Sequence, residues 1–126
     1  MKGKILIVDD DPAIVSAIET VLALEDYTTI TAFNGKDSLL TARAEKPQLI
    51  LLDYMLPDMT GKDVIDVIRG EEGLSGIPII LVSAAYGLKV LSADFPIQAV
   101  IEKPFEFSLL IATVAQFIGV TKNTPV

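Results

Sequence analysis

Carboxylate, hydroxyl and ammonium side chains stand at the ends of apolar segments at four places in the chain. Asp9 and Asp10 follow the first such segment, Asp53 follows a second, and Ser83 and Lys103 follow two later ones. Carboxylates that lie together raise one another's pKa, so three of them stay ionised only around a cation. An ammonium and a hydroxyl beside them would complete a receptor for a phosphoryl group, with one carboxylate as the nucleophile.

Each of these residues also has an ordinary structural explanation. Asp11 before Pro12 begins a helix, because aspartate caps the first turn and proline suits the first helical position, and the neighbouring aspartates could simply be solvated. Asp53 could enter a turn, Ser83 could be a turn hydroxyl, and Lys103 could be a surface lysine. The functional interpretation therefore depends on all four segments meeting at one edge.

Apolar segments typical of strands alternate with segments of helical periodicity. The central segment is apolar without interruption up to Asp53, which indicates a parallel strand buried on both faces. We expect strands at Lys4–Val8, Tyr27–Phe33, Leu49–Asp53, Ile77–Val82 and Ala99–Ile101. We expect helices from Pro12 to Glu25 or Asp26, at Lys36–Glu45, at Lys62–Arg69, weakly at Tyr86–Asp94, and at Phe107–Ile118. Right-handed crossovers then give a parallel sheet covered on both faces, with ligands at the carboxyl ends of its strands.

Composition narrows the class further. The 126 residues suit one domain, and 51% of them are apolar, which is enough for a core. No apolar run approaches the roughly 18 residues of a membrane span, and the first is too short for a signal peptide, so we expect a cytoplasmic protein without membrane contact. The absence of cysteine and histidine leaves only oxygen ligands, which favours Mg²⁺ where phosphate is also bound. A net charge of −7 argues against direct nucleic-acid binding.

Four motifs in combination resemble the response-regulator receiver domain, the CheY-like phosphoacceptor module of two-component signalling. They are IVDDDP at 7–12, LDYMLPDMTG at 52–61, Ser83-Ala84, and Lys103-Pro104-Phe105. The similarity covers almost the whole chain. It implies a flavodoxin-like α/β sandwich of five βα units, with a parallel sheet in the order 2-1-3-4-5. It also implies a receiver domain over residues 1–120, followed at 121–126 by a tail or the start of a linker.

The resemblance assigns roles to the metal-binding residues. Asp53 would accept a phosphoryl group from the phosphohistidine of a cognate histidine kinase. Mg²⁺ would be bound by Asp10, Asp53 and the backbone carbonyl of Met55, with Asp9 assisting through a water molecule.

The same resemblance assigns roles to the residues around the phosphoryl group. Lys103 would pair with it, Ser83 would move to donate a hydrogen bond to it, and Ala84 would belong to the residues that bind it. The peptide bond between Lys103 and Pro104 would be cis, which X-Pro bonds permit at modest cost.

Two features depart from the family pattern. The residue three positions before Lys103 is usually a tyrosine or phenylalanine whose ring turns inward on activation, but here it is Val100. The segment between Ser83 and Lys103 contains Gly87 and Pro96, so we expect a stunted or irregular fourth helix. Both features concern how phosphorylation is relayed rather than whether it occurs.

The last helix, Phe107–Ile118, is apolar at nine of twelve positions and carries no charge. A surface helix ordinarily shows a polar face, so this face could be covered by a second copy of the chain or by a partner. Alternatively, small and weakly polar residues make an acceptable outer face; these are Ala112, Thr113, Ala115 and Gln116.

Two other functions fit part of the pattern. Asp9 and Asp11 match the Asp-x-Asp of haloacid-dehalogenase phosphohydrolases, with Asp9 as nucleophile, but only Glu106 follows Lys103 where that family needs an acidic pair. A receiver that serves only as a docking surface is also conceivable, although the complete acidic set argues against it. The favoured interpretation is a non-enzymatic phosphoacceptor that signals to an output domain or a downstream protein.

Overall fold

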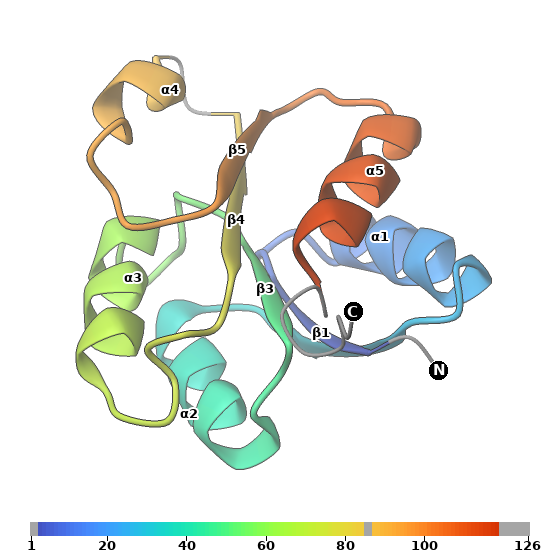
Figure 1. Cartoon of the computed structure of the whole chain (residues 1–126). Coiled ribbons are helices and arrows are strands. Elements are labelled where there is room, and N and C mark those ends of the chain that lie inside the picture. The colour runs from blue at the N-terminus through green and yellow to red at the C-terminus, as the bar shows by residue number, and fades with distance from the viewer. Residues whose placement is uncertain (1–2, 85–86, 119–126) are drawn as a thin grey trace, which may run out of the picture.

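The computed structural model describes residues 3–84 and 87–118. Strands and helices alternate along this part of the chain (Figure 1). The strands are β1 (Lys4–Val8), β2 (Thr28–Ala32), β3 (Leu49–Leu52), β4 (Ile79–Ser83) and β5 (Ala99–Glu102). The helices are α1 (Pro12–Leu24), α2 (Gly35–Glu45), α3 (Gly61–Gly70), α4 (Leu88–Leu91) and α5 (Phe107–Phe117).

All five strands form one parallel sheet in the order β2-β1-β3-β4-β5, as the family resemblance implied. The register pairs Val8 of β1 with Leu52 of β3, and Ser83 of β4 with Glu102 of β5. Neighbouring strands therefore end side by side, and the residues that follow them emerge at the same edge of the sheet.

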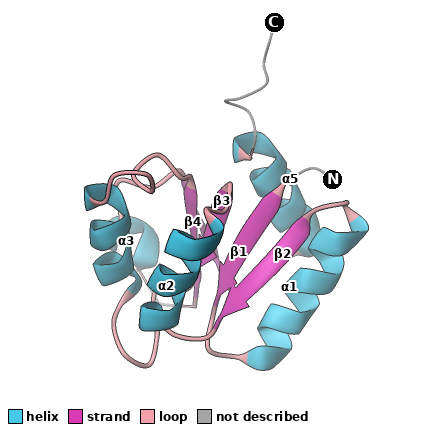
Figure 2. Ribbon diagram, turned by 90° about the horizontal axis from the view of Figure 1, so that it is seen from below, coloured by secondary structure: helices cyan, strands magenta, loops and turns pink. Residues whose placement is uncertain are grey.

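Helices cover both faces of the sheet, so two separate apolar cores form (Figures 1 and 2). One core lies under α1 and α5, and the other lies under α2 and α3. Strand β3 contributes to both in alternation: Leu49 and Leu51 face the first core, while Ile50 and Leu52 face the second. This alternation confirms that the uninterrupted apolar run is a central strand buried on both sides.

Side-chain caps explain where three helices begin. Asp11 Oδ1 accepts a hydrogen bond from the Ala13 N–H at 2.9 Å, with Pro12 at the first helical position of α1. Asn34 caps α2, and Thr60 caps α3 in a reciprocal capping box.

Several predicted boundaries were wrong by one or two residues. Tyr27 is not in β2, because its N–H bonds to the Leu22 carbonyl in the turn after α1. β4 begins at Ile79 rather than Ile77, because the Ile77 N–H bonds to Leu74 and Pro78 has no N–H to donate to a ladder.

The fourth helix is a single turn of four residues, which confirms the expected stunted helix; Ala85 and Tyr86 lie outside the described residues. The bond between Lys103 and Pro104 is cis, also as expected.

On α5, Leu110 and Val114 are buried in the core, whereas Ala112, Ala115 and Gln116 are exposed. These three residues form the small, weakly polar outer face that we considered as one alternative. Leu109 interrupts that face, with 52% of its surface exposed. Self-association through α5 stays a prediction.

Candidate functional site

The sheet places every predicted site side chain at one edge. Asp9 directly follows β1, Asp53 follows β3, Ser83 ends β4, and Lys103 follows β5. Backbone hydrogen bonds extend the strand pairing into the site: the Asp53 N–H bonds to the Val8 carbonyl, and the Lys103 N–H to the Ser83 carbonyl, both at 2.9 Å. The site geometry is thus a direct consequence of the strand register.

Lys103 joins the two buried carboxylates. Its Nζ lies 2.6 Å from Asp9 Oδ2 and 3.5 Å from Asp53 Oδ2. The Ser83 hydroxyl also forms a hydrogen bond with Asp53. Asp9, Asp53 and Ser83 are buried, whereas Asp10 is exposed. The structure therefore brings together residues from four segments that are far apart in the chain.

The surroundings of the Asp53 carboxyl group disfavour its ionised form. Burial and then the nearby Asp9 carboxylate raise its pKa, while Lys103, the Met55 N–H and the Ser83 hydroxyl act in the lowering direction. The Met55 N–H contact is long, at 3.3 Å to Asp53 Oδ1. A cation or a hydrogen-bonded phosphoryl group at Asp53 would relieve this strain.

Burial acts to lower the pKa of Lys103, but its hydrogen bond with Asp9 and the charge of Asp53 outweigh burial and raise it. Lys103 therefore remains a fixed positive charge at physiological pH. Fixed positive charge beside a carboxylate stabilises a phosphoryl group as it arrives.

The donor set fits a hard divalent cation. Asp9, Asp10 and Asp53 each offer a carboxylate oxygen, and these oxygens lie within 4.8 Å of one another. The cluster sets three carboxyl groups against the single ammonium of Lys103. Oxygen-only ligands with one exposed carboxylate suit Mg²⁺, which retains several water molecules.

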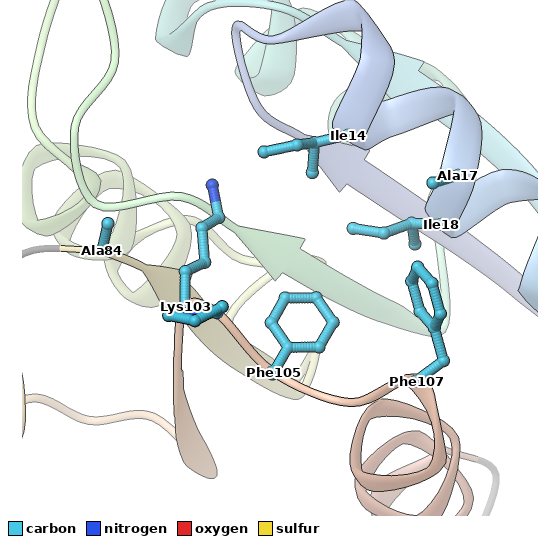
Figure 3. Close-up of a pocket in the computed structure, with 8 residues that line it drawn as sticks. Ile14, Ala17, Ile18, Ala84, Lys103, Phe105 and Phe107 are labelled. Atoms are coloured by element: carbon cyan, nitrogen blue, oxygen red, sulfur yellow. The ribbon is translucent and has the colours of Figure 1, made fainter.

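An apolar cavity of about 410 Å³ adjoins the site (Figure 3). Its lining comes from α1, from the residue after β4, and from the segment between β5 and the start of α5. The lining residues are Ile14, Ala17, Ile18, Ala84, Lys103, Pro104, Phe105 and Phe107. The Phe105 and Phe107 rings meet edge to face, with centroids 5.9 Å apart. The Lys103 amine points away from both rings, so the cavity is apolar inside and ends at the charged site.

Sequence reasoning missed this cavity. Ile14 and Ile18 lie one turn apart on α1, and Ile14 is only partly buried because it lines the cavity. The available signal was the adjacent Lys103-Pro104-Phe105 motif, which places an aromatic ring immediately after the site lysine.

The parallel sheet and its acidic, lysine-containing edge define the chain as an α/β domain of the phosphoryl-receiving type. A family model described as the response regulator receiver domain matches residues 5–115. Among curated proteins, the DNA-binding response regulator MtrA of Mycolicibacterium smegmatis is 36% identical over 127 residues, which cover 99% of this chain and 54% of MtrA. MtrA of Mycobacterium tuberculosis is also 36% identical, over 90% of this chain and 50% of its own length. The chain spans about half the length of these relatives.

Solved structures agree with these matches. The receiver domain of a signal transduction histidine kinase from Syntrophus aciditrophicus has a TM-score of 0.88 at 27% identity, covering 98% of this chain and 96% of that chain. The receiver domain of the sensor histidine kinase PA1611 from Pseudomonas aeruginosa has a TM-score of 0.86 at 26% identity, covering 94% and 99%. The latter was solved with a magnesium ion coordinated in its active-site cleft. This chain belongs to the response-regulator receiver family of two-component signalling.

The described helices have no membrane-spanning character. The longest of them, α1, has 13 residues, and none is both long and apolar enough to cross a bilayer.

Proposed function

We propose that Asp53 accepts a phosphoryl group from the phosphohistidine of a histidine kinase, and that the resulting aspartyl phosphate switches the conformation of the domain. The observation that carries this proposal is the convergence of Lys103 and Ser83 on Asp53. Both Asp9 oxygens are held at short range, Oδ2 by Lys103 Nζ at 2.6 Å and Oδ1 by the Asp11 N–H at 3.0 Å, whereas Lys103 Nζ and the Met55 N–H lie 3.5 and 3.3 Å from the Asp53 oxygens. Asp53 is therefore the better-placed nucleophile.

In the proposed reaction, an oxygen of ionised Asp53 attacks phosphorus while the phosphorus–nitrogen bond to the donor imidazole breaks. The electron pair of that bond stays with the imidazole, which takes up a proton. Lys103 would move its ammonium from Asp9 toward a phosphoryl oxygen, and the Ser83 hydroxyl would donate to another. Bound Mg²⁺, held by Asp9, Asp10, Asp53 and the Met55 carbonyl, would neutralise charge on the transferring group.

The apolar cavity supports a docking site for the donor protein beside Asp53. A kinase side chain that filled it would lie against Phe105 and Phe107 and bring its phosphohistidine to the edge where Lys103 ends. Ala84 lines the same cavity, and its role in binding the phosphoryl group stays a prediction. This surface would add binding energy without touching the reacting atoms.

The receiver would signal to an output domain or to a separate downstream protein. The curated relatives that it matches are DNA-binding response regulators about twice as long as this chain. The acidic receiver itself, with its net charge of −7, would not bind nucleic acid directly. We place this activity in the cytoplasm and assign no catalytic turnover to the domain beyond slow loss of its own phosphoryl group.

A haloacid-dehalogenase phosphohydrolase is the competing function, but the geometry disfavours it. That reaction needs Asp11 directed at the substrate beside Asp9, whereas the Asp11 carboxylate caps α1. Sustained hydrolysis of an aryl phosphate would nevertheless favour the phosphohydrolase.

The decisive experiment is mass spectrometry after incubation with acetyl phosphate and Mg²⁺. We expect one phosphoryl group on Asp53, and no labelling in Asp53→Asn. Asp66→Asn is the matched control, because it makes the same chemical change at an exposed aspartate that forms a surface salt bridge with Lys62. Labelling that persisted in Asp53→Asn but disappeared in Asp9→Asn would refute the assignment.

A further inference from the structure

The loop between β3 and α3 is fixed at its base by backbone contacts. Met55 and Thr60 form an antiparallel bridge across it, and the Gly61 N–H bonds to the Tyr54 carbonyl at 2.6 Å. Gly61 is required at this crossing, since a Cβ there would lie 2.9 Å from the Tyr54 Cα. The loop is thus a closed turn that starts at the phosphoacceptor strand.

The tip of the same loop is fixed by Asp58 to a different helix. Asp58 Oδ1 accepts a hydrogen bond from the Gly35 N–H at 2.7 Å, and Oδ2 accepts one from the Lys36 N–H at 2.9 Å. These two backbone hydrogen bonds lower the pKa of Asp58, so it is ionised at neutral pH. A charged carboxylate with two N–H donors at a helix N-terminus is a strong, oriented contact.

Packing supports the contact made by Asp58. Met59 lies against the bare Cα of Gly35, where a Cβ would meet the Met59 Cγ at 2.3 Å. α2 also has a cap from its own segment, because Asn34 Oδ1 accepts from the Asp37 N–H at 2.8 Å. α2 therefore has one cap of its own and a second from the β3–α3 loop.

We propose that Asp58 is a positioning residue for the metal site, because it holds in place the turn from which the Met55 backbone carbonyl would bind the cation. This inference rests on the proposed function, which makes that carbonyl a ligand. A backbone carbonyl has no rotamer of its own, so its direction is set by the loop. With the base closed by Thr60 and the tip held by Asp58, the turn needs no ordering when Mg²⁺ binds.

The test compares Asp58→Ala with Asn34→Ala. Both remove hydrogen bonds from the first turn of α2, but only Asp58→Ala releases the loop. Mg²⁺ affinity is measured by following the backbone amide resonances of residues 53–56 during a titration without phosphodonor, and melting temperature is measured in parallel. We expect Asp58→Ala to weaken Mg²⁺ binding by about tenfold, at the lower end of losses seen for outer-shell partners of metal ligands.

Asn34→Ala should leave Mg²⁺ affinity within about twofold of the wild type even where its melting temperature falls as far, because caps act on the helix. Asp58→Asn, which keeps one acceptor oxygen, should fall between the wild type and Asp58→Ala. Equal losses of affinity in Asp58→Ala and Asn34→Ala would overturn the inference, as would unchanged affinity in Asp58→Ala.

Failure of the proposed function is distinguished from failure of this inference by labelling with acetyl phosphate. If Asp58→Ala weakened Mg²⁺ binding but the wild type never carried phosphate on Asp53, the proposed function would be refuted and the positioning role supported. A chain that was labelled on Asp53 but bound Mg²⁺ independently of Asp58 would do the reverse.

Discussion

Helices α3 and α4 follow neighbouring strands and lie on the same side of the sheet (Figure 1), yet only α3 is a full helix. α3 has ten residues, a capping box at Thr60, and a buried stripe of Val64, Ile65 and Ile68. α4 has four residues, preceded by Gly87 with a φ of 74°. Two adjacent positions on one face of the sheet are therefore filled in different ways.

The segment after α4 supplies the packing that its helix does not. Phe95 and Ile97 pack against the same core as α3, beside Val100 of β5. The Phe95 ring stacks on Tyr54, with centroids 6.5 Å apart and planes 20° apart, and Lys62 Nζ lies 5.7 Å from the Phe95 centroid. A loop thus replaces much of a helix because its apolar side chains reach the same core.

The largest expected effect tests whether the two helices differ in what they stabilise. Ile65→Ala removes a fully buried side chain from α3 and should lower the free energy of unfolding by about 2–5 kcal/mol. Leu91→Ala, in α4, removes a side chain that is 54% exposed and should cost less than about 0.5 kcal/mol. Urea denaturation followed by circular dichroism measures both, and comparable losses would show that α4 contributes to the core after all.

A smaller effect tests what holds the segment between α4 and β5, residues 92–98, in place. Arg69, in α3, donates to the carbonyls of Pro96, Ser75 and Ile77 at 2.7, 3.0 and 2.7 Å, and to Gln98 Oε1 at 3.2 Å. Arg69→Ala leaves these acceptors without that donor and should cost about 1–3 kcal/mol.

Arg43→Ala is the matched control for Arg69→Ala, because exposed Arg43 pairs with Glu71 and should contribute no more than about 1 kcal/mol. Hydrogen exchange should also become faster at residues 95–98 in Arg69→Ala and stay unchanged in Arg43→Ala. Unchanged exchange at 95–98 would mean that Arg69 does not anchor this segment.

The comparison also shows what the sequence could predict. The site edge was predictable because parallel strands end together, so a polar residue after each apolar run is enough to bring Asp53 and Lys103 together. The shortened α4 was predictable from Gly87 and Pro96. The position of Phe95 was not predictable, because it depends on the path of a loop across α3 rather than on any local periodicity.

The Asp58 contact with α2 was equally hidden. Asp58 and Gly35 are 23 residues apart, and neither has a pattern that indicates the other. The cavity beside Lys103 depends on the spacing of α1 from Phe105 and Phe107, which again is a tertiary property. Local rules thus predicted the elements and the strand ends, whereas contacts between loops required the structure.

A further prediction concerns how a conformational change at Asp53 reaches the segment between α4 and β5, residues 92–98. Tyr54 directly follows Asp53, and its ring contacts Phe95, whereas Val100 offers no ring at the usual switch position. Phe95→Leu keeps an apolar side chain but removes the stacking, at a cost of about 1 kcal/mol. We expect the response of residues 92–98 to the phosphate mimic beryllofluoride, followed by amide chemical shifts, to shrink in this variant.

Phe33→Leu is the control for Phe95→Leu, because it alters a ring that is 43% exposed and lies in the connection from β2 to α2. It should leave the beryllofluoride response of residues 92–98 unchanged. A full response in Phe95→Leu would show that the signal leaves the site by another route, such as the movement of Ser83.

The smallest expected effect is a pH dependence of folding stability caused by Asp53, the first residue of the loop from β3 to α3. Its pKa is raised in the folded chain, chiefly by burial and then by Asp9. As pH rises, the unfolded chain loses this proton first, so the folded state loses stability across the interval between the two pKa values, and the loss persists above it. Without Mg²⁺, Asp53→Asn should therefore melt at a higher temperature than the wild type at neutral pH, and the difference should narrow as the pH falls through the folded pKa.

Mg²⁺ should reduce this difference in melting temperature by stabilising only the wild type appreciably, and the control Asp66→Asn should show neither behaviour. A difference that stayed constant with pH would mean that the gain comes from the amide's packing, and that the Asp53 charge does not strain the site.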